Sequence, residues 1–247
     1  GFRAWLPLAA MAAGMRKRPA SAMAGQPHTL RLTYLDLKGV AEPIRLALFC
    51  GGLDFEDRRI GYEEISAMRR SGELPFGQVP VLEIDGKPHA QAQALLRWVG
   101  NLAGFYPEDL QLQCDEIEEA LLDMKKILNP QWYGVVMGRD PRTGEKLVPL
   151  SDDQKVEVER VLNEAILPAR FAQLEQKLAS SGGPYFCGNR MTICDLSFYV
   201  YGSGILDGSF VGGISSAVLD SCPALRAHVE RMAAHPRVKE WNERHSA

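Results

Sequence analysis

The sequence lacks the patterns that mark several special classes of protein. No stretch approaches the run of about 18 apolar residues that a membrane-spanning helix needs, so no membrane span is predicted. Lysine and arginine form no stripe along the chain, which argues against nucleic acid as the main partner. The body contains no internal repeat and no low-complexity tract. These absences leave an ordinary globular protein.

Cysteine is scarce and its spacing is uninformative. The chain holds five cysteines, an odd number, with no CxxC pair and no spacing typical of a metal site. The sequence therefore predicts a reducing compartment, no disulfides and no metal. Cys50 and Cys194 lie on apolar helix faces and are predicted to be core residues.

Acidic residues are absent from the first part of the chain. Residues 1–35 carry five basic side chains and no acid, and taking these five charges from the net charge of −3 leaves −8 on the other 212 residues. Residues 1–26 are alanine-rich, with the basic cluster after the apolar run, the reverse of a secretory signal. Two interpretations stay open: an organelle transit peptide, or residues of an untranslated leader or a cloning vector. We expect a cytoplasmic protein, or an organellar one if residues 1–26 are a transit peptide.

Residues 27–105 have the pattern of a small α/β domain. Alternating apolar residues, turn signals and helical spacing predict the order β-α-β-α-β-β-α. Leu30, Leu32 and Tyr34 share one face of the first strand, and Asp85-Gly86 predicts a hairpin turn. The predicted strands are 29–35, 55–60, 79–84 and 87–90, and the predicted helices are 41–50, 63–70 and 91–102. A linker is expected at 104–108.

Residues 109–247 are predicted to form an all-helical domain. One apolar stripe with 4, 3, 4 spacing starts at Ile117, and a second helix over 156–178 is expected to kink at Pro168. The apolar segment 129–150 between them has the length of a loop that covers a ligand pocket or a neighbouring subunit. Thr192 and Asp195 form a capping box at the start of a further helix, with a structural role.

Three local features together indicate a binding site for a small peptide-like molecule. Tyr34 ends the first strand, Pro80 lies near the start of the third, and Gln91 opens the third helix. The position of Tyr34 alone favours an aromatic residue at the edge of the core, so the functional interpretation depends on the combination. If the bond before Pro80 is cis, the backbone of Val79 is available to pair with an added extended peptide.

Three sequence blocks carry a family resemblance. Residues 32–45 (LTYLDLKGVAEPIR), 74–86 (LPFGQVPVLEIDG) and 90–97 (AQAQALLR) occur in this order. They resemble cytosolic glutathione S-transferases of the sigma type and their relatives, over roughly residues 28–247. The resemblance implies a thioredoxin-like N-terminal domain, an all-α C-terminal domain with the acceptor-substrate pocket, and a homodimer. It also implies glutathione as co-substrate, with a small hydrophobic electrophile as the second substrate.

The resemblance assigns roles to particular residues. A neutral phenol at Tyr34 would donate a hydrogen bond to the glutathione sulfur and favour its thiolate form, which makes Tyr34 the catalytic residue. Val79 and Pro80 would pair with the cysteinyl backbone, and Gln78 would lie beside the glycyl end. Gln91 and Ala92 would present the N-terminus of the third helix to the γ-glutamyl carboxylate.

The chain also departs from the family pattern. Ala92 stands where the family has a serine whose hydroxyl holds the γ-glutamyl carboxylate, and Val40 replaces a family arginine. Arg69 or Arg70 would supply the missing cation. Asp115 matches an acid that reaches across the dimer to the γ-glutamyl amine, although a solvated helix acid fits the pattern as well.

We therefore expect a glutathione transferase that acts in detoxification. A glutathione-dependent isomerase of the prostaglandin D synthase type is a second hypothesis, because it uses the same thiolate without net conjugation. A non-catalytic ligand-binding or crystallin-like member of the family is a third, and the replaced serine and arginine favour it.

Overall fold

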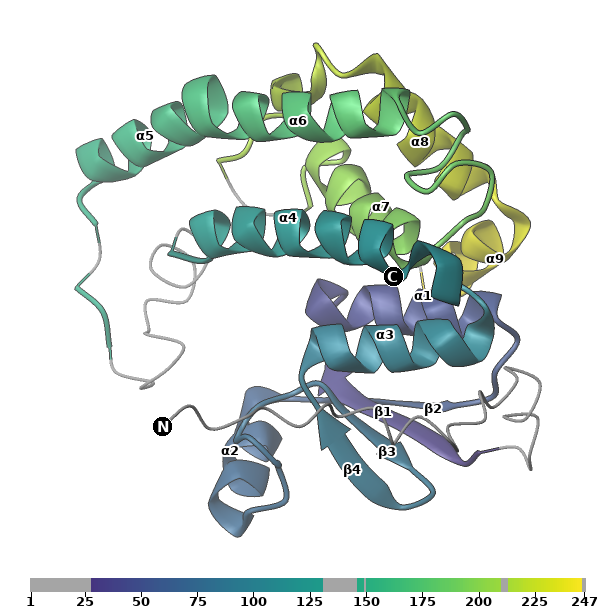
Figure 1. Ribbon diagram of the computed structural model, residues 1–247. Coiled ribbons are helices and arrows are strands. Elements are labelled where there is room, and N and C mark those ends of the chain that lie inside the picture. Colours follow the sequence, from purple (N-terminus) through teal and green to yellow (C-terminus); the bar gives the residue numbers. More distant parts are fainter. Residues whose placement is uncertain (1–27, 131–145, 149, 210–212, 246–247) are drawn as a thin grey trace, which may run out of the picture.

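The computed structural model describes residues 28–130, 146–148, 150–209 and 213–245. A four-stranded sheet with the order β2-β1-β3-β4 forms the N-terminal part (Figure 1). β2 pairs with β1 in parallel, while the β1–β3 and β3–β4 pairs are antiparallel. The strands are β1 (Leu30–Leu35), β2 (Glu56–Ile60), β3 (Val81–Ile84) and β4 (Lys87–Ala90).

Helices cover both faces of this sheet. α1 (Glu42–Cys50) and α3 (Ala92–Ala103) lie between the sheet and the helical domain (Figure 1). α2 (Tyr62–Ser71) packs on the other face, where its residues Ile65 and Met68 form a separate small core with Val81. Successive strand residues point to opposite faces, so the neighbouring Leu82 belongs to the main core instead. The predicted thioredoxin-like α/β arrangement is confirmed.

The predicted strands and helices of this part differ from the structure only at their ends. The largest difference is β3, which begins at Val81 rather than at Val79. The peptide bond between Val79 and Pro80 is cis. Because proline has no N–H to donate, it cannot extend the hydrogen-bonded ladder in the interior of a sheet, and the strand starts after it.

The rest of the described chain is helical, as predicted. The helix over 156–178 is in fact α5, a π-helical turn at Leu162–Ile166, and α6. Proline lacks the N–H that would bond to the carbonyl four residues earlier, so the regular pattern is interrupted on the N-terminal side of Pro168. The helices are α4 (Gln111–Pro130), α5 (Asp152–Val161), α6 (Leu167–Ala179), α7 (Ile193–Leu206), α8 (Pro223–Ala234) and α9 (Pro236–Arg244).

α7 is the central helix of this domain and is buried along nearly its whole length. The apolar stripe of α4 faces it: Ile117, Leu121, Met124 and Leu128 are all buried. Cys194 is fully buried as predicted, whereas Cys50 is half-buried. Among the described residues, no helix combines the length and the apolar character needed to cross a membrane. The predicted leader, 1–26, and most of the segment 129–150 lie outside the described residues.

Candidate active site

Three of the predicted site residues meet at one edge of the sheet because of strand register. Thr33 of β1 lies opposite Val81 of β3, and Val81 lies opposite Ala90 of β4. Tyr34, Pro80 and Gln91 are the chain neighbours of these three residues, each one position beyond the last pair of its ladder. This edge therefore unites the end of β1, the start of β3 and the start of α3, as Figure 1 shows for the elements.

Tyr34 lies largely buried at this edge, with 8% of its surface exposed. Its hydroxyl lies directly under the turn that follows β1: a Cβ atom at Gly39 would come 2.6 Å from Tyr34 Oη. Gly39 also has a φ of +47°, which glycine adopts at little cost. Glycine at this position therefore allows the turn to pass over the phenol.

Arg45 fixes the position of that turn. Its guanidinium is fully buried and donates to the carbonyl oxygens of Leu37 (2.8 Å) and Leu35 (3.3 Å). Two carboxylates neutralise it, those of Asp57 (2.9 Å) and Glu42 (3.2 Å). The guanidinium carbon also lies 5.6 Å from the centre of the Tyr34 ring. Sequence reasoning assigned no role to this network, although Glu42 and Arg45 belong to the first sequence block.

The backbone around the cis bond is open, as the β-augmentation hypothesis requires. Within the described residues, Val79 makes no backbone hydrogen bond, and it is half-buried. Gln78 is exposed and Pro80 is buried. The residues of this segment therefore lie where an extended peptide would pair with them.

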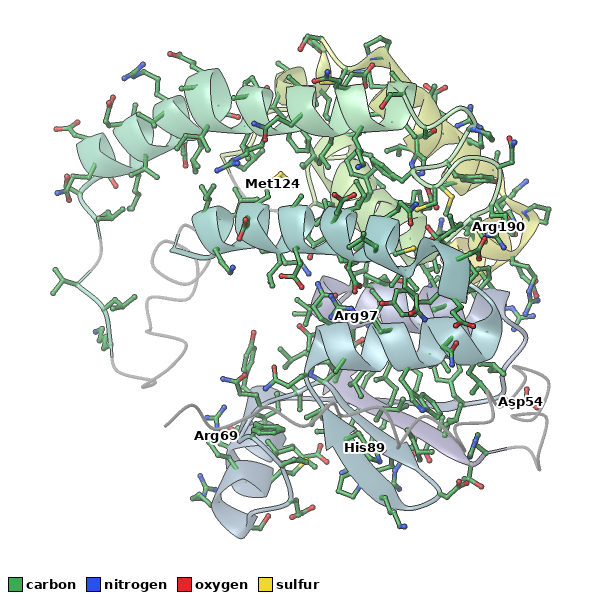
Figure 2. All side chains as sticks on the ribbon, in the orientation of Figure 1. Asp54, Arg69, His89, Arg97, Met124 and Arg190 are labelled. Atoms are coloured by element: carbon green, nitrogen blue, oxygen red, sulfur yellow. The ribbon has the colours of Figure 1, made fainter. Side chains whose placement is uncertain are left out.

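The two candidate cations of α2 have different environments. Arg69 donates from Nε to the Gly77 carbonyl (2.7 Å) and thereby supports the loop before Gln78. Arg70 is exposed and makes no hydrogen bond or ion pair within the described residues. Figure 2 shows Arg69 on α2. Of the two, Arg70 is therefore the one whose guanidinium has no partner within the described residues.

Gln91 has an unusual backbone conformation. Its φ is +78° and its ψ is 100°, outside the regions that residues other than glycine normally occupy. It precedes the first residue of α3, Ala92, and its side chain makes no capping hydrogen bond. Strain of this kind costs on the order of 1–3 kcal/mol and is concentrated at functional sites. The first N–H groups of α3 have no partner within the helix, and such groups suit a carboxylate.

Asp115 lies on α4 and is engaged within its own chain. Its Oδ1 accepts from Arg97 Nε (2.7 Å) and from the Tyr106 hydroxyl (3.0 Å). Arg97, labelled in Figure 2 between α3 and α4, also donates to Glu119 (3.0 Å). Burial, and then the Asp115 charge, raise the pKa of Tyr106 to about 12. The predicted contact of Asp115 with glutathione across a dimer stays a prediction.

One buried acid near the start of α3 escaped sequence reasoning. Glu118 is 1% exposed, and neither carboxylate oxygen makes a hydrogen bond within the described residues. Burial raises its pKa to about 7, although the nearby Ser197, Lys125 and Gln93 oppose the rise. Lys125 lies over the Tyr201 ring, with Nζ 4.8 Å from the ring centre, and burial lowers its pKa. A polar pair is thus enclosed between α3, α4 and α7.

Comparison with known proteins identifies relatives over most of the chain. Residues 145–245 match the C-terminal domain of glutathione S-transferases. Glutathione S-transferase 1 of Ascaris suum is 32% identical over 217 residues, 85% of this chain and 94% of that protein. Human glutathione S-transferase A3 is 30% identical over 223 residues, 89% of each chain.

Solved structures of such proteins have the same fold. A monomeric glutathione S-transferase from the hookworm Necator americanus is 28% identical, with a TM-score of 0.72, covering 87% of this chain and 97% of that one. Prostaglandin synthase D of Nilaparvata lugens is 25% identical, with a TM-score of 0.71, covering 88% and 98%. On these similarities in sequence and fold, the chain belongs to the glutathione S-transferase family.

Proposed function

We propose that this protein is a glutathione transferase in which Tyr34 activates the glutathione thiol. The observation that supports this proposal is the pairing of Thr33 with Val81 and of Val81 with Ala90, because Tyr34, Pro80 and Gln91 are the chain neighbours of these residues at one edge of the sheet. A phenol there donates a hydrogen bond to sulfur and favours the thiolate, which is the nucleophile. The thiolate sulfur forms a bond to an electrophilic carbon of a small hydrophobic acceptor, and a leaving group departs or a proton is taken up.

The remaining site residues hold the tripeptide. The backbone of Val79, beside Pro80, pairs with the cysteinyl unit, and Gln78 lies beside the glycyl end. The γ-glutamyl carboxylate binds at the N-terminus of α3, through the N–H groups that follow Gln91. Ala92 contributes only its backbone there. Arg70 supplies a cation near the peptide, which the absence of any partner for its guanidinium in the described residues supports.

The finer assignments belong to the same proposal. The protein is of the sigma type and acts in detoxification in the cytoplasm. Each chain has two domains, 27–105 and 109–247. Two chains form a homodimer in which Asp115 reaches the glutathione bound to the partner chain. An organellar location follows instead if residues 1–26 are a transit peptide. The cofactor is glutathione as co-substrate, and the reaction uses no metal. Static light scattering tests the dimer, and a monomer, the state named for the hookworm relative, would contradict it.

Two other functions use the same fold. Glutathione-dependent isomerisation is supported by the similarity to the prostaglandin synthase of Nilaparvata lugens. A non-catalytic, ligand-binding or crystallin-like role is supported by the replaced serine and arginine at Ala92 and Val40.

One set of measurements separates the three functions. The protein is passed over glutathione-agarose and then assayed with an aryl halide and with an endoperoxide, and the products are identified by mass. We expect retention on the resin and a glutathione conjugate of the aryl halide. Release of an isomer with glutathione regenerated would establish the isomerase, and failure of both binding and turnover would contradict the proposal and favour the ligand-binding role.

A further inference from the structure

The fold brings together three cysteines that are far apart in sequence. Cys114 comes from α4, Cys187 from the turn before α7, and Cys194 from the first turn of α7. The Cys187 sulfur lies 3.8 Å from that of Cys114 and 4.0 Å from that of Cys194, and all three sulfurs lie within 4.8 Å of one another. We call these three residues the thiol cluster. Their spacing along the chain contains no sign of it.

The distances fit a single bound metal ion. The three sulfurs form a triangle with sides of 3.8, 4.0 and at most 4.8 Å. The point at equal distance from all three lies at most about 2.5 Å from each sulfur, close to the metal–sulfur distance of about 2.3 Å found for thiolate ligands of zinc. An ion in the plane of the three sulfurs would therefore bond to all of them with little movement of the side chains. No backbone rearrangement is needed.

Cysteine binds metals as the thiolate, and the three cysteines of the cluster differ in how readily they form it. Donation from the Cys114 and Cys194 thiols lowers the pKa of Cys187, and the charge of Lys177 acts in the same direction. The pKa values of Cys114 and Cys194 are raised. A bound cation would displace the thiol protons and replace them as the stabilising charge.

The cluster is enclosed but reachable. Cys114 and Cys194 are fully buried, whereas Cys187 is half-buried in the turn. Its backbone pairs with that of Arg190, which Figure 2 shows on the side of the helical domain away from α2. The cluster is therefore separate from the edge that carries Tyr34, and an ion from solvent reaches it by way of Cys187.

The donor set decides which kind of ion fits. Among the described residues, the group that can reach one ion holds three sulfurs and no histidine or carboxylate. The nearby carboxylate of Asp195 is occupied by Thr192, Phe186 and His228. Structural zinc sites take four protein ligands, whereas soft thiolates also select Cu(I).

We propose that the thiol cluster is a binding site for one soft, thiophilic cation, Cu(I), held by the thiolates of Cys114, Cys187 and Cys194. The bound ion joins α4 to the N-terminus of α7 and to the turn between α6 and α7. Binding is not redox chemistry: three Cu–S bonds form, and the protons of the cysteine thiols pass to solvent. Its occupancy therefore falls as the solution is made more acidic.

The test uses the full-length reduced protein, without glutathione, whose thiol would compete. Cu(I) is titrated under nitrogen against a chromophoric Cu(I) chelator, and Zn(II) is titrated separately. We expect one tightly held Cu(I) per chain, with Cu–thiolate absorption in the near ultraviolet and a raised Tm. The Cys187→Ser variant is expected to lose this equivalent, and Cys50→Ser, which alters a half-buried cysteine outside the cluster, is expected to keep it.

A second measurement needs no variant. Bound Cu(I) is expected to protect Cys187 from alkylation by iodoacetamide, whereas the metal-free protein is alkylated there, as peptide mass mapping reports. Equal Cu(I) binding by wild type and Cys187→Ser would overturn the proposal, and so would a preference for Zn(II) over Cu(I). Absence of Cu(I) binding by the reduced wild-type chain would also overturn it.

Discussion

In the proposed site at the start of α3, Ala92 would offer a bound carboxylate its backbone N–H and no hydroxyl. The helix N-terminus there is open, since Gln91 makes no side-chain cap and leaves the first N–H groups available. A hydrogen bond to a charged group contributes about 1.5–3 kcal/mol. Because Ala92 lacks a hydroxyl, we predict that the protein binds glutathione less tightly than a variant with serine at this position.

We predict that Ala92→Ser increases the affinity for glutathione by about 10- to 150-fold, the equivalent of that one hydrogen bond. Isothermal titration with glutathione measures the change. Ala94→Ser, on an exposed position of the same helix, is the matched control and is expected to bind like the wild type. An unchanged Kd for Ala92→Ser would show that the carboxylate binds elsewhere.

Glu118 gives a prediction of pH dependence. Its pKa is raised from 4.5 to about 7 in the folded protein, so the folded state binds its proton more tightly than the unfolded state. Stability linked to this group is therefore present at low pH and is lost as the pH rises from about 4.5 to about 7.

Across that window, the unfolding free energy of the wild type is predicted to fall by about 3 kcal/mol relative to that of Glu118→Gln, which cannot ionise. Urea unfolding of both proteins at a series of pH values gives the difference. The exposed neighbour Glu119→Gln serves as the control. A difference that stays constant with pH would mean that Glu118 titrates as an ordinary surface carboxyl.

The sequence could predict some of the site residues but not others, for physical reasons. Tyr34, Pro80 and Gln91 lie at the ends of predicted strands and inside recognisable blocks, so their meeting follows from register. Glu118 looks like a solvated acid because it directly follows Ile117 of the apolar stripe, and only the packing of α3 and α7 shows its burial. The thiol cluster depends on contacts between residues 73 apart in the chain, which no local pattern encodes.

At the scale of elements, α7 depends on one buried carboxylate. Asp195 accepts from the backbone N–H groups of Phe186 (2.9 Å) and Thr192 (2.8 Å), from the Thr192 hydroxyl (2.9 Å), and contacts His228 Nε2 (2.9 Å). The capping role predicted from the sequence is confirmed. The additional links, to the preceding turn and to α8, make Asp195 a junction between three segments.

We predict that Asp195→Ala lowers the unfolding free energy by about 3–5 kcal/mol, because buried donors on three segments lose their acceptor. Denaturant unfolding measures it. The control is Asp109→Ala: Asp109 is an exposed acid paired with Arg190 at the surface, and its removal is expected to cost less than about 1 kcal/mol. A similar loss for both variants would contradict the assignment.

Most element boundaries followed from periodicity and capping residues, and the deviations occur at prolines. Pro80 ends the ladder of β3, and Pro168 follows the π-helical turn between α5 and α6. In both places, the missing N–H of proline predicts a break but leaves its form undetermined. The form depends on the packing of the neighbouring helices and strands.

At the scale of the whole molecule, the two domains share a buried interface. All residues of α1 from Glu42 to Leu48 are buried, since α1 packs against α3 and against α7 and α9 of the helical domain. Trp241 of α9 donates to Glu42 (2.7 Å), and Arg237 donates to the Phe49 carbonyl (2.7 Å). A Cβ at Gly100 would come 2.4 Å from Ile193, so α3 and α7 are in close contact. Each domain would therefore expose buried residues of this interface if the two were separated.

We therefore predict that both domains unfold in one transition. Trp98 on α3 and Trp241 on α9 report on the two domains through fluorescence, and far-ultraviolet circular dichroism reports on all helices. The denaturant midpoint measured by tryptophan fluorescence is expected to coincide with the midpoint measured by circular dichroism. Two separate transitions would show that units 27–105 and 109–247 fold independently.

The central claim is that Tyr34 stabilises the thiolate of bound glutathione. Its most direct measurement is the ultraviolet absorbance of that thiolate in the saturated complex as a function of pH. The wild type and Tyr185→Phe, a half-buried control, are predicted to hold the bound thiol's pKa well below its ordinary value of about 8.5, while Tyr34→Phe returns it toward that value. A bound thiol with the same pKa in Tyr34→Phe and the wild type would contradict the account.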